Sequence, residues 1–472
     1  MSSVKIIKDS LFYGLVPKLT IFISVFTLPL ITPFLTTFDY GISGVLASYS
    51  SFMIAVLPLG LHVHLANSFF ELPRHYNLVW GRVLYLMLLS SILFGFLNFL
   101  ILSLTLPIHF SMKLLLLSVV GSIPVLCTTN SVLANHLFPL LQKPQPLVLT
   151  NLLGSVVSLV LSFVLIYFFR LGYWGLIVPN VLSGLIVFFL FVKFIWIDYN
   201  IKPIVDHNIK RIVWMLKIGL PLVPHALGFV FLTSSARIVM SQLHVSYDEI
   251  GLFSHGCTMG DYAVMVTTAL ITAISPNIQR AYRSHDYTRY RKLYYLCQSV
   301  AFVTSILVCI WIPEIYGFLI KNVELRQSSS IASIMCFSNV VFAFYVFQST
   351  PVFIEKDTFQ LLWLVFVPGL LNLILCFVGI PIFGYRAAIY STIISYWSQL
   401  FIPFIVSYYH KNVKMWLGNL KKLVVVFLVL LSGLIGAQFV SGTPQLYKVL
   451  ITLLIAIIFC LVYKKKKMFE LV

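Results

Sequence analysis

The sequence has few charged residues, and acidic side chains are the scarcer kind. Only 10% of the 472 residues are charged, with 14 acidic and 32 basic side chains, whereas 60% are hydrophobic. No hydrophilic stretch long enough to form a domain separates the apolar runs, so the composition excludes a soluble globular protein. The runs are about 20 residues long, which is the length of helix that crosses the hydrocarbon core of a bilayer. An integral membrane bundle is therefore predicted.

Several motifs are also missing. The seven cysteines lie in apolar segments without CxxC spacing, which favours packed core residues over a disulfide framework or a metal site. No GxxxxGK[ST] string is present, so nucleotide-driven transport is not expected. The net charge of +18 comes from basic residues in short loops, and no basic domain exists to bind a duplex. We expect no nucleic-acid partner, no cofactor and no metal.

Fourteen apolar segments can each span a bilayer, which predicts an all-α polytopic membrane protein of about 14 transmembrane helices. The only long connection is residues 198–212, between the sixth and seventh spans. The segments are residues 12–35, 42–68, 80–105, 113–138, 146–169, 173–197, 213–240, 250–279, 292–313, 328–352, 358–380, 383–408, 420–440 and 445–463.

The positions of lysine and arginine set the predicted orientation. With the N-terminus in the cytoplasm, most of the 32 basic residues fall in cytoplasmic loops and span ends, as the positive-inside rule requires. The basic tail at Lys464–Lys467 is then also cytoplasmic, and an odd number of spans would place it outside. Two basic residues, Lys18 and Arg237, lie within spans.

A weak internal repeat links the segments FDYGISGVLASYS (Phe38–Ser50) and YDEIGLFSHGC (Tyr247–Cys257). Each follows an apolar helix with two prolines and consists of an acidic turn and a glycine that opens the next span. The repeat predicts two parallel six-helix lobes, residues 1–205 and 206–412, with residues 413–472 as two further helices and a tail. Parallel repeats place a transported substrate between the halves. Alternatively, the two segments are not a repeat, because an acidic turn followed by glycine is common between helices.

Three stretches, Thr27–Phe52, Gly219–Met240 and Tyr247–Tyr282, resemble Wzx-type O-antigen and lipid-linked oligosaccharide flippases of the multidrug/oligosaccharidyl-lipid/polysaccharide (MOP) exporter superfamily. The resemblance implies fourteen spans, twin lobes, cytoplasmic termini and a place in the bacterial inner membrane. In many such flippases an acidic residue directly precedes the intramembrane arginine, whereas Ala236 precedes Arg237 here. A local Asp–Arg pair is therefore not available.

The resemblance also implies a cargo and partners. The cargo would be undecaprenyl-pyrophosphate-linked oligosaccharide repeat units, as in O-antigen, lipopolysaccharide or capsule synthesis, moved from the cytoplasmic to the periplasmic leaflet. Membrane lipid is a necessary partner, and a polysaccharide polymerase and a chain-length regulator are the expected protein partners.

Basic and imidazole side chains within spans are the candidate substrate-binding residues, because a diphosphate needs cations in the cavity that receives it. Arginine suits a diphosphate, since its planar fork donates two hydrogen bonds at once. Lys18 could instead snorkel to the inner surface, and Arg237 could pair with Asp248 or Glu249 near the outer end of its span. The full set is Lys18, His62, His225, Arg237 and His255.

Other intramembrane residues carry further expectations. Asp261 is the candidate for coupling an ion gradient to transport, with a cation partner or a protonated structural role as alternatives. His62 and His64 are two residues apart, so they are expected to point to different faces, and no metal site is expected there. Gly256 and Gly260 form GxxxG, which favours close helix packing.

Two other functions compete with the flippase. A membrane polysaccharide polymerase or acyltransferase would need a sizeable outer loop with clustered polar residues, and the outer loops here are short. A multidrug or cation exporter of the same superfamily would be expected to have twelve spans and acidic residues in its first half, where Asp39 and Glu71 lie only at span edges. The prediction is a non-enzymatic transporter that works by alternating access.

Overall fold

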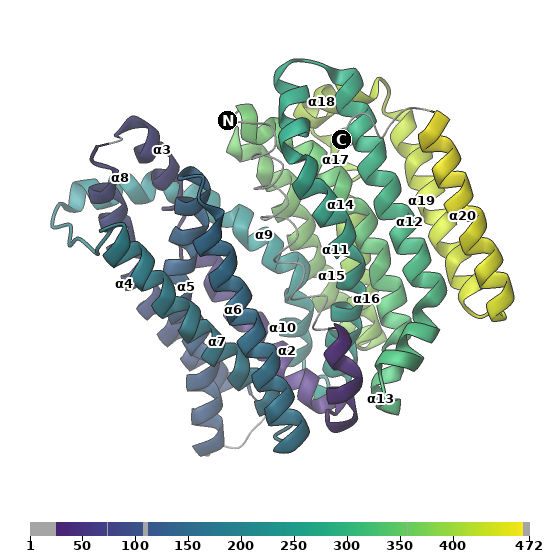
Figure 1. Cartoon of the computed structure of the whole chain (residues 1–472), viewed down its shortest axis with the longest axis horizontal. Coiled ribbons are helices and arrows are strands. Elements are labelled where there is room, and N and C mark those ends of the chain that lie inside the picture. The colour runs from purple at the N-terminus through teal and green to yellow at the C-terminus, as the bar shows by residue number, and fades with distance from the viewer. Residues whose placement is uncertain (1–24, 73, 107–111, 356, 466–472) are drawn as a thin grey trace. The chain divides into compact units, whose positions relative to one another are not determined.

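The computed structural model describes residues 25–72, 74–106, 112–355 and 357–465, and the regular elements in these ranges are all helices (Figure 1). Ten helical segments among them are long and apolar enough to cross a membrane, and each overlaps one of the predicted spans. The chain is thus a multi-pass, all-helical membrane protein, as predicted. The long connection is confirmed too, because residues 201–208 are not helical.

Four predicted spans differ from the other ten. Most of span 12–35 lies outside the described residues. Spans 42–68 and 383–408 are interrupted, the first by a turn at residues 57–62 and the second by a turn at residues 399–401. The segment 445–463 forms the last helix of the chain, Gln445–Lys465.

Contacts divide the chain into two compact units, which meet in sequence at Gly251 and Leu252. The helices of the first unit are α2 (Thr37–Val56), α3 (Val63–Glu71), α4 (Tyr76–Thr105), α5 (Met112–Leu140), α6 (Pro144–Phe163), α7 (Trp174–Val192), α8 (Ile209–Gly219), α9 (Val223–Thr233) and α10 (Ser235–Gln242). The contact boundary lies after the predicted repeat boundary at residue 205, because α9 and α10 pack on α2. The two six-helix lobes remain a prediction about the repeat.

The second unit begins within α11 (Tyr247–Arg283), whose first turn belongs to the first unit. Helix α12 packs against α14 and α19, and α19 lies beside α20 (Figure 1). The remaining helices are α12 (Tyr287–Leu319), α13 (Val323–Arg326), α14 (Ser329–Glu355), α15 (Val367–Phe383), α16 (Arg386–Ser398), α17 (Ile402–Ile405), α18 (Ser407–Leu417), α19 (Lys421–Ser441) and α20 (Gln445–Lys465).

The core of the first unit is formed by apolar and aromatic side chains of α3, α4, α5 and α7, which include Trp80, Phe138 and Phe191. The Trp80 indole N–H donates to the Leu65 carbonyl at 3.0 Å, so α3 is held on α4 by a hydrogen bond as well as by packing. Helix α5 contacts both α4 and α7, and α6 packs on α7. The helices α5, α6 and α7 thus form one continuous wall of the unit.

The first acidic turn of the repeat is a helix cap. The Thr36 hydroxyl accepts from the Asp39 backbone N–H at 3.3 Å, and the Asp39 carboxylate accepts from the Thr36 backbone N–H at 2.8 Å. This capping box satisfies two backbone donors at the start of α2. Asp39 also accepts from the Tyr173 backbone N–H at 2.8 Å, which ties α2 to the turn before α7.

The two repeat segments meet in a reciprocal contact at the starts of α2 and α11. A Cβ at Gly41 would lie 2.0 Å from the Tyr247 carbonyl oxygen, and a Cβ at Gly251 would lie 1.7 Å from the Thr37 carbonyl oxygen. Each glycine is four residues after the residue that the other one touches, so the two segments take matching places in the contact. The Thr37 hydroxyl also donates to the Asp248 carboxylate. This correspondence supports the internal repeat.

Small residues allow close packing in the second unit. A Cβ at Gly256 would lie 2.6 Å from Ile331, and one at Gly260 would lie 2.6 Å from Met335, both on α14. The GxxxG pair is therefore a packing surface, as predicted. The six cysteines whose side chains are described are all buried, which agrees with the prediction of core residues.

An ion pair joins two helices of the second unit. Lys448 lies in the first turn of α20 with only 2% of its side chain exposed. Its ammonium donates to the Glu314 carboxylate at 2.5 Å, which fastens α20 to α12.

Candidate functional site

Two histidines stack in the first unit, and a third lies near them. The rings of His62 and His136 stack with centroids 5.4 Å apart and an interplanar angle of 14°. His225 lies in the neighbourhood of His62. All three side chains are half-buried. Two of the predicted site residues, His62 and His225, are thus brought together, and we call His62, His136 and His225 the histidine cluster.

His136 was missed by the sequence reasoning. It lies in α5, within the predicted span 113–138, so it carried the signal that singled out the other histidines, an imidazole inside an apolar segment. Its closeness to His62 could not be read from the sequence, because the two residues belong to different helices.

The turn between α2 and α3 explains why the cluster forms. Leu59 and Gly60 have positive φ angles of 48° and 68°, so the helix is interrupted after Pro58 by a turn. A Cβ at Gly60 would lie 1.9 Å from the Gly219 carbonyl oxygen, so the turn touches the end of α8. The chain then passes through a short 3-10 turn, Leu220–Leu222, into α9, whose first turn carries His225. His62 occupies the N-cap position of α3, two residues after Gly60, and its side chain makes no capping hydrogen bond.

His64 has a different environment from His62, as their spacing predicts. Its ring is buried and its Nε2 lies 3.0 Å from the Met215 carbonyl oxygen, while Trp214 packs against it at a centroid distance of 5.3 Å. The side chain links α3 to α8. We therefore regard His64 as a structural residue.

Arg237 lies on α10, directly after a break in the seventh predicted span. Helix α9 ends at Thr233 and α10 begins at Ser235, and the Arg237 guanidinium donates to the Thr233 carbonyl at 2.9 Å. Its side chain is half-buried. The two acidic residues weighed as its partners make other hydrogen bonds, since Asp248 accepts from Thr37 and Glu249 accepts from the Ser246 hydroxyl at 3.1 Å.

His255 is packed inside the second unit. Its side chain is 1% exposed, its Nδ1 lies 2.7 Å from the Ser328 hydroxyl, and its ring meets Tyr316 edge-on at 5.8 Å. These contacts hold α11 against the segment before α14. Asp261, by contrast, is exposed two turns further along α11, directly after the packed Gly260. Lys18 lies outside the described residues.

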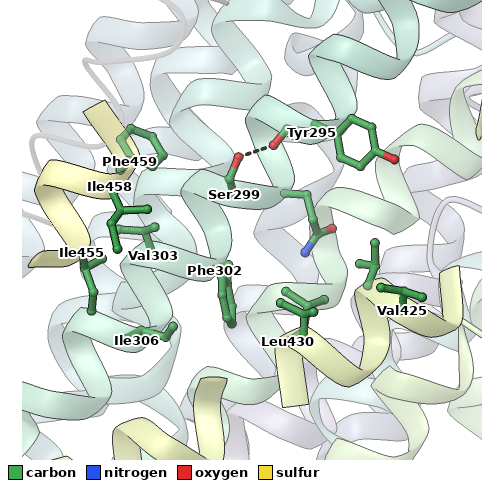
Figure 2. Close-up of a pocket in the computed structure, with 13 residues that line it drawn as sticks. Tyr295, Ser299, Phe302, Val303, Ile306, Val425, Leu430, Ile455, Ile458 and Phe459 are labelled. Atoms are coloured by element: carbon green, nitrogen blue, oxygen red, sulfur yellow. Dashed lines mark hydrogen bonds between the residues drawn. The ribbon is translucent and has the colours of Figure 1, made fainter. Parts of the chain in front are cut away.

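An apolar groove of about 530 Å³ lies in the second unit between α12, α19 and α20 (Figure 2). Phe302, Ile306 and Leu430 are among the side chains that line it. Polar groups are few there: the Gln298 amide N–H donates to the Val340 carbonyl at 2.8 Å while its side-chain oxygen has no hydrogen-bond partner among the described residues, and the Ser299 hydroxyl donates to the Tyr295 carbonyl. The groove therefore suits a hydrocarbon chain and not a sugar or a phosphate.

Comparison with known proteins gives a family match for the sequence and a fold match for the structure. The sequence matches the family model described as "Polysaccharide biosynthesis protein" over residues 6–282. No curated protein matches it.

Several solved structures share the fold at low identity. The inward-facing conformation of a multidrug resistance MATE family transporter of the MOP superfamily aligns with a TM-score of 0.61 and 16% identity, over 85% of this chain and 96% of that chain. The outward-facing conformation of such a transporter aligns with a TM-score of 0.52 and 14% identity, over 90% of this chain and 95% of that chain. A MATE in complex with MaL6 aligns with a TM-score of 0.53 and 12% identity, over 86% of this chain and 96% of that chain. These similarities show a MATE-like fold.

Proposed function

The chain belongs to the polysaccharide biosynthesis protein family, whose model matches more than half of it, and from this we propose that it is a lipid-linked oligosaccharide flippase. Its cargo would be undecaprenyl-pyrophosphate-linked repeat units of the O-antigen or capsule type. It would move them from the cytoplasmic to the periplasmic leaflet of a bacterial inner membrane, with both termini in the cytoplasm.

We propose alternating access between two six-helix lobes within fourteen spans. The ten observed spans and the MATE-like fold support this architecture. The matching contact of Gly41 and Gly251 supports the repeat on which the two lobes rest. An inside-negative membrane potential favours outward movement of an anion by about 2.3 kcal/mol per charge per 100 mV.

The observation that carries the proposal is the basic and imidazole character of the span residues in the first unit. His136 and His225 lie in helical segments that are long and apolar enough to cross a membrane. His62 and Arg237 lie in predicted spans, and such side chains are costly within a bilayer and usually serve a transport path. In the described part of α4–α7, no Asp or Glu lies inside a helix. An anionic cargo fits this charge pattern better than a cationic drug. Lys18 is a further proposed ligand of the diphosphate.

The other two predicted residues take different proposed roles. The contacts of His255 suit a structural residue that fixes α11 in the second unit. Asp261 is exposed in the middle of a spanning helix, so it remains our candidate for returning a proton or another cation after the cargo leaves. The apolar groove of the second unit would hold hydrocarbon, either the polyprenyl tail or an ordinary lipid chain.

Deletion of the gene in its host tests the proposal. We expect surface polysaccharide to disappear and lipid-linked repeat units to accumulate in the inner membrane. Arg237→Ala should reproduce this loss at normal protein level, whereas Lys321→Ala, which removes an exposed cation just after α12, should not. Normal polysaccharide with raised sensitivity to cationic drugs would instead favour the multidrug exporter.

A further inference from the structure

A second groove, in the first unit, is polar. It has a volume of about 640 Å³, within the range of roughly 300–1,000 Å³ that small-molecule sites occupy, and lies between α5, α6 and α7. Hydroxyl and amide side chains from all three helices line it, and none of the described residues that line it is charged. Its polar side chains include Ser131, Asn151, Ser155, Ser158, Asn180 and Ser183. We call this the neutral groove.

The neutral groove lies at membrane depth. Helix α6 begins at Pro144 and rises about 1.5 Å per residue, so Asn151 and Ser158 are about 10 and 20 Å along a helix that is about 30 Å long. Polar groups in the middle of a span are costly when they face hydrocarbon, and they are tolerated where they line a wet cavity or meet a partner. The lining of this groove therefore calls for an occupant other than lipid.

Hydrogen bonds within and between the helices use only some of the polar groups that line the neutral groove. The Ser158 hydroxyl donates to the Asn180 side-chain oxygen at 2.9 Å, which joins α6 to α7, and the Ser155 hydroxyl donates to the Asn151 backbone carbonyl at 2.9 Å. These bonds use the hydroxyl protons and leave oxygen lone pairs available. The Asn180 side chain is exposed but engaged, since its amide N–H also donates to the Leu176 carbonyl at 2.9 Å. The exposed Asn151 side chain offers a donor and an acceptor to an occupant.

A glycine in the groove provides a position at which the open space can be filled. A Cβ at Gly184 would meet nothing within 4 Å, in contrast to one at Gly154, which would lie 2.4 Å from Val187. Packing therefore does not require glycine at position 184. Glycine inside a helix costs about 0.5–1 kcal/mol relative to alanine. The open space that Gly184 leaves in the groove is the feature that a larger residue would remove.

We propose that the neutral groove binds sugar residues of the lipid-linked glycan. This inference rests on the proposed function. Sugar hydroxyls both donate and accept hydrogen bonds, which matches a lining of hydroxyl and carboxamide groups. The lack of cations in the lining favours neutral sugars over acidic ones, because a sugar carboxylate would find no charged partner there. Recognition of the sugar is thus separate from recognition of the diphosphate.

Binding of two lipids to the full-length protein in nanodiscs tests this inference. The first lipid is the repeat-unit lipid that accumulates in cells lacking the chain, and the second is undecaprenyl diphosphate, which has the same phosphates and tail without sugar. Wild-type protein should bind the glycan lipid more tightly. Gly184→Leu should weaken binding of the glycan lipid at least tenfold and leave binding of undecaprenyl diphosphate unchanged. Gly436→Leu, at another open glycine outside the groove, should change the binding of neither lipid.

The outcomes separate this inference from the proposed function. A wild-type preference for the glycan lipid that Gly184→Leu leaves intact would overturn the neutral groove alone. Wild-type protein that binds neither lipid would overturn both proposals. If Gly184→Leu does not fold, Asn151→Ala replaces it, because that exposed side chain can be shortened without disturbing packing. A selective loss for the glycan lipid is then expected again, and equal binding would overturn the inference.

Discussion

The reciprocal glycine contact gives a prediction with a definite sign. An alanine at position 251 would place its Cβ 1.7 Å from the Thr37 carbonyl oxygen, and one at position 41 would place it 2.0 Å from the Tyr247 carbonyl oxygen. The atoms in the way are backbone, so α2 and α11 must move apart at this point. Overpacking of this kind costs about 1–3 kcal/mol. Both Gly41→Ala and Gly251→Ala should therefore lower the Tm.

The control substitution, Gly436→Ala, is expected to raise the Tm. Gly436 lies inside α19, and a Cβ there would meet nothing within 4 Å. Alanine at this position should stabilise the helix by about 0.5–1 kcal/mol, since it removes the conformational cost of glycine.

The two contact glycines should also be coupled. One separation of α2 from α11 relieves both clashes, so the double variant Gly41→Ala/Gly251→Ala should lose less stability than the two single variants together. The measurement is the Tm of wild type, the two single variants and the double variant, each purified in the same detergent. Single variants as stable as wild type, or losses that simply add, would refute the reciprocal contact.

Three further predictions concern other contacts. Lys448→Met should lower the Tm because it leaves the Glu314 carboxylate without its cation, and adding Glu314→Gln should restore most of the loss. The Asn208 backbone N–H, with two nearby arginines, holds the pKa of Asp206 below its usual range. The stabilisation is present above the unfolded-chain pKa of about 3.9 and is lost as the pH falls through the lowered pKa, so Asp206→Asn should flatten the acid-side fall in Tm; an unchanged slope would contradict this. His136→Phe keeps a stacked ring but removes the imidazole, so glycan export should fall at least tenfold with normal protein yield.

Much of the fold could be read from the sequence because apolar length and charge in loops act locally. Ten predicted spans coincide with long helices, and the GxxxG pair packs as expected. The break in span 42–68 does not follow from hydropathy. It depends on positive φ angles at Leu59 and Gly60 and on contact with Gly219, which is distant in sequence. Hydropathy carries no information about such a contact.

The candidate site was less accessible to sequence reasoning. His62 and His225 could be named as polar residues in spans, but only the structure joins them and adds His136. His255 was grouped with them by residue type, whereas its environment is a packed interior with Ser328. The neutral groove was missed because single serines and asparagines in spans are common, and only their convergence on one space distinguishes them.

Transport by the purified protein tests the central proposal most directly. The repeat-unit lipid would be placed in both leaflets of proteoliposomes, and its exposure on the outside would be followed with an enzyme that cannot cross the membrane. Wild-type protein should make the inner pool accessible, and Arg237→Ala should slow this at least tenfold while Lys321→Ala does not. Vesicles in which wild-type protein leaves the inner pool protected, or in which Arg237→Ala transports at the wild-type rate, would contradict the account.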